Sequence, residues 1–130
     1  MTATFLGWYL DYDMKVLVFE DNLMWSARLI QTLKSLGHEA VVLSELSGDQ
    51  VADVAILNLS SPSFAALVPP LRQAGIYTIC HAGHKEKDLL QLGREAGCDA
   101  VATNSELTYK IEGLLQAVPI APKSREHGSK

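Results

Sequence analysis

Residues 54–60 read VAILNLS, a short apolar run that ends on a polar residue. The run 54–57 contains β-branched and aliphatic residues only, which is typical of a strand covered on both faces of a sheet. Asn58 ends it. In an open α/β sheet, ligands and reactive groups collect at the carboxyl ends of the strands. Asn58 is therefore a site residue, the remnant of a site, or a turn residue.

Predicted strands and helices alternate on both sides of this run. The other strands are predicted at residues 15–19, 39–43, 77–81 and 100–103. Helices are predicted at 21–37 with Asp21 or Asn22 as N-cap, near 85–96, and from Ser105 onward as one helix. Because strict alternation favours parallel strands with right-handed crossovers, we expect an α/β fold of three layers, with a doubly wound five-stranded parallel sheet between helices.

Two of the predicted crossovers are irregular. Only ten residues, 44–53, separate the second strand from the third, which is near the lower limit for a parallel connection. The second helix should therefore be shortened or absent. In the next crossover, Ser61 and Pro62 are a good helix start, but Pro69 and Pro70 fall where the helix interior should be. We expect that helix to kink or restart there.

Composition excludes several classes of function. The 130 residues include 11 basic and 15 acidic side chains, a net charge of −4 with no block of like charges, so nothing favours nucleic acid or an anionic membrane as a partner. Cys80 and Cys98 lack metal-ligand spacing and read as two small core residues of a protein in a reducing compartment, so a structural disulfide is not expected. We expect a cytoplasmic protein.

The two ends of the chain differ from its middle. Residues 1–13 lack the basic start and cleavage site of a signal peptide, and their apolar run is too short to span a bilayer. Met14 opens the first clear strand. The expected organisation is an N-terminal extension over 1–13, one domain over 14–118, and a flexible polar tail over 119–130.

Between Met14 and Val118 the chain resembles the receiver domains of two-component response regulators. The stretch VLVFEDN (16–22) is similar to their first strand with its acidic pair, and REAGCDAVATNSE (94–106) to the approach to their fifth strand. The resemblance implies a CheY-like, flavodoxin-like sheet with strand order 2-1-3-4-5. It also implies a site in which the acidic pair binds magnesium and an aspartate ending the third strand accepts a phosphoryl group.

Most of that site is missing here. Glu20 and Asp21 match the acidic pair, but the phosphoacceptor position holds Asn58, whose amide is a poor nucleophile without charge. The family's Thr or Ser at the end of the fourth strand corresponds to Ala82, and its Lys after the fifth strand to Asn104. The chain therefore resembles a pseudo-receiver with a vestigial phosphorylation pocket.

Two further departures concern the fifth strand. The proline that usually follows the Lys is replaced by Ser105, so the Asn104–Ser105 peptide bond should be trans, because a cis bond there would cost about 2.5–4 kcal/mol. The aromatic residue that swings on activation in the family is replaced by Val101.

Three features have a second interpretation. Glu20 and Asp21 either cap the first helix or form part of a metal site that lacks its third carboxylate. His81 and His84 are either turn and helix-start residues or zinc ligands. The first helix is apolar over a wide arc, which indicates core packing or a partner-binding face. No metal or other cofactor is expected.

The sequence contains no catalytic motif, so we do not expect an enzyme. The preferred function is a phosphorylation-independent interaction module that binds a protein partner or a second copy of itself. Its face, taken from the family, would include Leu92, Val101 and Tyr109, and the competing surface is the aromatic arm in residues 1–13. The alternative function is a small-molecule or metal sensor with a crevice lined by Glu20, Asp21, Asn58, His81, His84 and Asn104.

Overall fold

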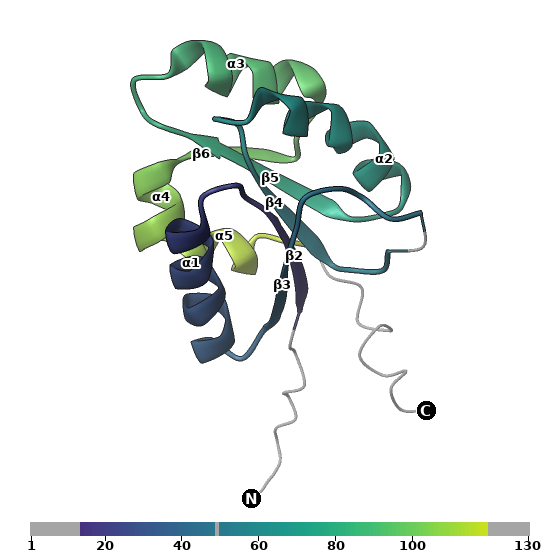
Figure 1. The fold of residues 1–130 in the computed structure, drawn as a ribbon, viewed down its shortest axis with the longest axis vertical. Helices are drawn as coiled ribbons and strands as arrows, with labels where there is room; N and C mark the ends of the chain where they lie inside the picture. Colours follow the sequence, from purple (N-terminus) through teal and green to yellow (C-terminus); the bar gives the residue numbers. More distant parts are fainter. Residues whose placement is uncertain (1–13, 49, 120–130) are drawn as a thin grey trace, which may run out of the picture.

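The computed structural model describes residues 14–48 and 50–119. In that part of the chain, the strands are β2 (Lys15–Phe19), β3 (Glu39–Leu43), β4 (Val54–Asn58), β5 (Tyr77–Ala82) and β6 (Ala100–Thr103). The helices are α1 (Leu23–Ser35), the 3-10 helix η1 (Pro62–Leu67), α2 (Val68–Gln73), α3 (Lys87–Ala96), α4 (Asn104–Tyr109) and α5 (Ile111–Gln116) (Figure 1).

These strands form one parallel sheet in the order β3-β2-β4-β5-β6. Counted along the described chain, this is the order 2-1-3-4-5, so the expected doubly wound topology is confirmed. The central strand β4 pairs with β2 on one side and β5 on the other, and residues 54–57 are fully buried. The unbroken apolar run in the sequence therefore reflects a strand with a core on each face.

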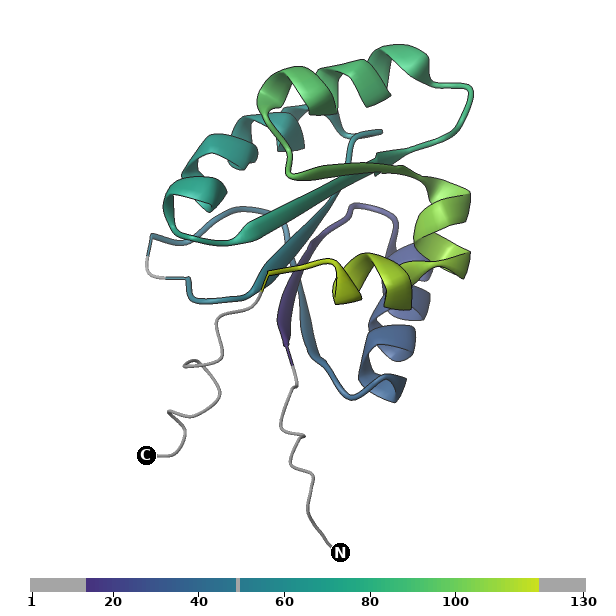
Figure 2. The same ribbon diagram turned by 180° about the vertical axis from the view of Figure 1, so that it is seen from behind.

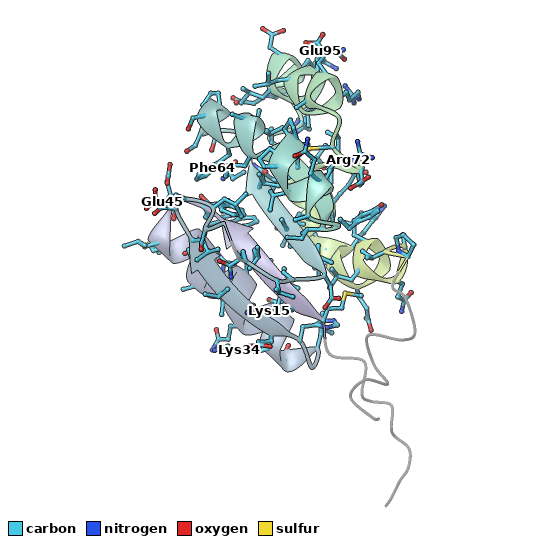
Figure 3. All side chains as sticks on the ribbon, turned by 90° about the vertical axis from the view of Figure 1, so that its right-hand side faces the viewer. Lys15, Lys34, Glu45, Phe64, Arg72 and Glu95 are labelled. Atoms are coloured by element: carbon cyan, nitrogen blue, oxygen red, sulfur yellow. A yellow bond between two sulfur atoms is a disulfide. The ribbon has the colours of Figure 1, made fainter. Side chains whose placement is uncertain are left out.

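Helices cover both faces of the sheet (Figures 1 and 2). One face packs against η1, α2 and α3 around Leu17, Phe19 and Leu57. The other face packs against α1, α4 and α5 around Val18 and Ile56. Figure 3 shows the two layers from the side, with Phe64 and Arg72 on one side of the sheet and Lys34 on the other.

Both irregular crossovers are confirmed. The described residues between β3 and β4 contain no helix. In the next crossover, Ser61 and Pro62 start η1, and the chain restarts as α2 at Val68 with the two prolines in its first turn. Proline is tolerated in a first turn because the N–H groups there have no intrahelical partner.

The expectation of one continuous last helix is wrong. Thr103 and Glu106 form a capping box that starts α4, with Thr103 Oγ1 accepting from Glu106 N at 3.1 Å and Glu106 Oε1 accepting from Thr103 N at 2.8 Å. At Lys110 the backbone leaves the helical region, with φ −127°, and α5 begins at Ile111. The break still leaves Leu107 and Ile111 buried in the same core. Apolar spacing alone does not reveal such a break.

The expectation of two unlinked cysteines is also wrong. Cys80 in β5 and Cys98 just before β6 form a disulfide, with a Cα–Cα distance of 6.3 Å. Gly97 ends α3 in the left-handed conformation, with φ +90°, and this turn brings Cys98 back toward β5. The pairing depends on that tertiary turn, which is why the spacing of the cysteines in the sequence did not indicate it.

Leu92 was predicted to belong to an interaction face and was therefore expected to be exposed, but this expectation is wrong. Leu89 and Leu92 are half-buried against the core, and Leu90 is buried. A Cβ atom on Gly93 would lie only 2.9 Å from Leu59 Cδ1 and 3.3 Å from Cys80 Cβ, so the glycine lets α3 approach the sheet closely. This close approach covers both leucine-bearing sides of the helix in part.

Other expectations concern the ends of the chain and the membrane. The predicted N-terminal extension (1–13) and residues 120–130 of the predicted tail lie outside the described residues. None of the helices in the described ranges has the length and apolar character needed to cross a membrane.

Candidate functional site at the carboxyl ends of the strands

The parallel sheet brings most of the sequence-predicted site residues together at the carboxyl ends of its strands. Glu20 directly follows β2, Asn58 ends β4, Ala82 ends β5, and Asn104 directly follows β6. In the β4–β5 register, Asn58 is paired with His81. The expected positions at strand ends are therefore observed, because neighbouring parallel strands end on the same side of a sheet.

Asn58 and Glu20 form the centre of this site at the carboxyl ends of the strands. Asn58 Nδ2 donates a hydrogen bond of 2.7 Å to Glu20 Oε1, and Asn22 N donates one of 2.9 Å to Glu20 Oε2. Asn58 Oδ1 accepts from Ser60 N at 3.0 Å and from Ser60 Oγ at 2.8 Å. Glu20 is only 6% exposed, and both of its oxygens have donors. Both oxygens of this buried carboxylate are therefore satisfied by hydrogen bonds within the protein.

Asp21 lies outside this pair and is exposed. Its carboxylate accepts a short hydrogen bond from the hydroxyl of Ser61, at the start of η1. Within the described residues, no three His, Cys, Asp or Glu side chains are grouped so that they could hold a metal ion. The arrangement does not fit the magnesium site that the resemblance implied, because the third carboxylate is an amide and the two carboxylates are each engaged by protein donors.

The first helix is capped by an amide rather than by a carboxylate. Asn22 is the N-cap of α1, and its Oδ1 accepts from Trp25 N at 2.9 Å. Neither Glu20 nor Asp21 is the N-cap residue, but Glu20 does accept a backbone N–H at this helix start, that of Asn22. Asn22 was one of the two N-cap candidates, and an asparagine cap satisfies the free N–H groups of the first turn as well as an aspartate does.

His81 was predicted to end the strand over 77–81, and it does lie in the corresponding strand, β5. Its interpretation as a turn residue is wrong, because its side chain is only 1% exposed. Its Nδ1 lies 2.7 Å from Asn104 Oδ1, and its ring stacks on Trp25 with centroids 5.0 Å apart and an interplanar angle of 18°. A polar residue that continues a run of apolar strand residues was the available signal.

The protonation of His81 follows from this environment. Burial lowers the pKa of the imidazole, and the hydrogen bond to Asn104 and the negative charge of Glu20 oppose this shift. Since the neutral ring has one donor and one acceptor nitrogen, the contact with Asn104 Oδ1 is made by an Nδ1–H donor. His84, by contrast, is exposed in the turn after β5, as expected.

The remaining predicted residues are spread over the α3–β6–α4 region. Val101 is half-buried in β6, and Tyr109, at the end of α4, is 84% exposed. Ala82 is buried and offers only a methyl group where receivers have a hydroxyl. The described residues contain no cis peptide bond, so the trans geometry expected for Asn104–Ser105 is confirmed.

The sequence matches no known family model and no curated protein, whereas several solved structures are similar in fold. The receiver domain of the TMAO respiratory response regulator TorR is 23% identical, with a TM-score of 0.64 over 80% of this chain and 98% of that one. A Burkholderia pseudomallei response regulator with a phosphorylated aspartic acid, calcium ion and citrate is 16% identical, with a TM-score of 0.66 over 90% and 72%.

A receiver protein from Burkholderia phymatum is 18% identical, with a TM-score of 0.63 over 82% of this chain and 98% of that one. These identities are low, but the same five-stranded parallel order recurs in the structure described here. The chain has the fold of response-regulator receiver domains.

Proposed function

We propose that this chain is a receiver-like regulatory domain that acts by binding a protein and is not switched by phosphorylation. The observation that carries the proposal is the 2.7 Å hydrogen bond from Asn58 Nδ2 to Glu20 Oε1. It joins the residue in the phosphoacceptor position to the residue in the metal-binding position. A neutral amide lacks the carboxylate that would attack phosphorus, and both oxygens of its partner carboxylate already accept hydrogen bonds from the protein.

The groups around this pair support the same interpretation. The similar Burkholderia pseudomallei protein carries a phosphorylated aspartic acid and a calcium ion. Here, Ala82 offers no hydroxyl to a phosphoryl oxygen, and Asn104 offers no positive charge and is bonded to His81. A transferred phosphoryl group would therefore lack the preorganised donors and charges that stabilise it.

An interaction function also needs surface that a partner could cover. Among the described residues, the large hydrophobic side chains with the greatest exposure include Tyr109 on α4 and Leu23 and Met24 on α1. Tyr109 was part of the predicted face, whereas Leu92 offers less exposed apolar surface to that face than expected, because it is half-buried. Tyrosine is enriched in protein interfaces because it combines a large apolar area with a polar end.

A phosphodonor experiment tests the first half of the proposal. Incubation of the full chain with acetyl phosphate and magnesium should leave its intact mass unchanged. Asn58→Asp alone should also give no stoichiometric adduct, whereas the triple variant Asn58→Asp, Ala82→Thr and Asn104→Lys restores the missing groups and should gain a hydroxylamine-labile one. A stoichiometric labile adduct on the wild-type chain would overturn the proposal.

Light scattering tests the homodimer form of the second half. If the wild-type chain self-associates through the predicted face, Tyr109→Asp should give a monomer. The control variant Glu95→Ala, at an exposed position of α3, should leave the oligomer intact. A chain starting at Met14 tests the arm. An oligomer that survives Tyr109→Asp but is lost on this truncation would move the interface to residues 1–13, and a strictly monomeric wild type would leave a heterologous partner.

A further inference from the structure

A groove is lined by residues of α1 and α4. These two helices lie on the face of the sheet opposite α2 and α3 (Figure 2). The volume of the groove is about 350 Å³, and its lining comes from α1, α4 and the start of α5. It is separate from the Asn58–Glu20 pair, neither member of which lines it. This volume lies within the range of about 300–1,000 Å³ that is usual for small-molecule sites.

The groove is apolar at its base and aromatic at its rim. Leu29, Leu107 and Ile111 line it and are buried in the core. Trp25 and Tyr109 also line it, the first half-buried and the second exposed. This combination of an apolar base with aromatic walls is typical of sites that hold the hydrocarbon part of a ligand.

The lining of the groove includes one charged side chain. Arg28 is the only charged residue of its lining, and within residues 14–48 and 50–119 it forms no ion pair or hydrogen bond. The same lining contains the aliphatic hydroxyl groups of Thr32, Ser105 and Thr108. An unpaired guanidinium with hydroxyl groups beside an apolar base complements a carboxylate attached to a hydrocarbon.

We infer that this groove binds a small organic carboxylate with an aryl or alkyl body. The carboxylate pairs with Arg28, and the body lies on Leu29, Leu107 and Ile111 between the two aromatic side chains. The restricted volume and the hydroxyl groups favour such a ligand over an apolar helix of a partner protein, which would bury Thr32 and Thr108 without partners.

The groove also contacts the site at the strand ends. Trp25 and Asn104 line it, and these are the two side chains that stack on and bond to His81. A ligand against Trp25 therefore touches the residues that hold the buried imidazole. Ligand binding in this groove is independent of the proposed function, because the absence of phosphorylation neither requires such a ligand nor excludes it.

Isothermal titration and NMR shift mapping on the full chain test this inference. The probes are 3-phenylpropionate, octanoate and indole-3-acetate, each compared with its primary amide, which has a similar shape and no charge. We expect saturable binding of acids from this panel, about tenfold weaker binding of the matching amides, and shifts at the Trp25 indole and the Asn104 side-chain amide. Arg28→Gln should weaken the acids to the level of the amides.

The control variant is Lys34→Gln, which removes a cation from the same helix outside the groove and should leave acid binding unchanged. Circular dichroism checks that both variants fold. Absence of saturable binding for all three acids, equal binding of acids and amides, or binding that Arg28→Gln leaves unchanged would each overturn the inference. Self-association that Arg28→Gln abolishes, without acid binding, would assign the groove to a protein and also overturn it.

Discussion

The two edges of the sheet are built differently. Among the described residues, β3 at one edge pairs with β2 alone, no helix lies in the connection to β4, and Val41 and Val42 are each 37% exposed. At the other edge, β6 pairs within the same residues with β5 alone, and it contacts both α3 and α4. The two strands have similar lengths and apolar sequences, so strand propensity does not account for the difference.

Side-chain links to the rest of the fold distinguish the β6 edge. The disulfide joins Cys98 to Cys80, and Asp99 Oδ2 accepts from Thr78 N at 2.9 Å and from Thr78 Oγ1 at 3.1 Å. Arg72 on α2 adds an ion pair to Asp99, with Nε 3.2 Å from Oδ1. The β3 edge has its backbone ladder with β2, its packing against α1, and one side-chain hydrogen bond, from Met14 N to His38 Nδ1 at 3.2 Å. We therefore expect substitutions at the β6 edge to cost more stability.

The largest effect should come from the disulfide. Cys98→Ser should lower the free energy of unfolding by about 2–4 kcal/mol, because the crosslink closes a short loop in the unfolded chain, with a sequence separation of 18 residues. Urea denaturation with and without a reductant measures it. Reduced wild-type protein should match the variant, and equal stability of oxidised and reduced protein would show that the crosslink does not anchor this edge.

The Asp99 contacts should have the next largest effect. Asp99→Ala leaves the buried Thr78 N–H without its acceptor and should cost about 1–3 kcal/mol in urea denaturation. The matched control is Arg72→Gln, which removes only a half-exposed ion-pair partner and should cost about 1 kcal/mol or less. If the control costs as much as Asp99→Ala, the ion pair rather than the hydrogen bonds holds the edge.

A smaller, pH-dependent effect should come from His81, which links β5 to Asn104 beyond β6. Its pKa in the folded chain lies below the ordinary 6.5, so the unfolded chain takes up this proton at a higher pH than the native chain. The free energy of unfolding should therefore fall as the pH drops below the ordinary value. His81→Gln should flatten this part of the stability profile, and His84→Gln in the exposed turn should not.

The smallest effect is expected at the open edge. Val41→Thr should change the free energy of unfolding by about 0.5 kcal/mol or less, because the side chain is already partly solvated. Val101→Thr in β6, where Val101 Cγ2 lies near Gly93, should cost more. Equal costs at the two positions would remove the distinction between the edges.

Local pattern predicted the parts of this molecule that depend on local chemistry. The buried run 54–57 and the restart of the helix at the prolines of α2 behaved as their sequence indicated. The positions of Glu20 and Asn58 followed from the strand ends. Their mutual hydrogen bond was not foreseen, because it depends on the rotation of one amide between two strands.

Features that depend on tertiary approach were missed. The disulfide forms because a left-handed turn at Gly97 returns the chain to β5, and His81 is buried because Trp25 from α1 covers it. Leu92 is half-buried because the missing side chain of Gly93 brings α3 close to the sheet. In each case, the decisive contact comes from another element, far from the residue in the sequence.

The break at Lys110 has a consequence for hydrogen exchange. The helices α4 and α5 have six residues each, too short to be stable alone, so their amide protons are protected only while Leu107 and Ile111 stay packed. We expect these amides to exchange through local opening, and those of β4 only through global unfolding. Asn58 and Asn104 would then belong to different exchange units, although both lie at the carboxyl ends of the strands.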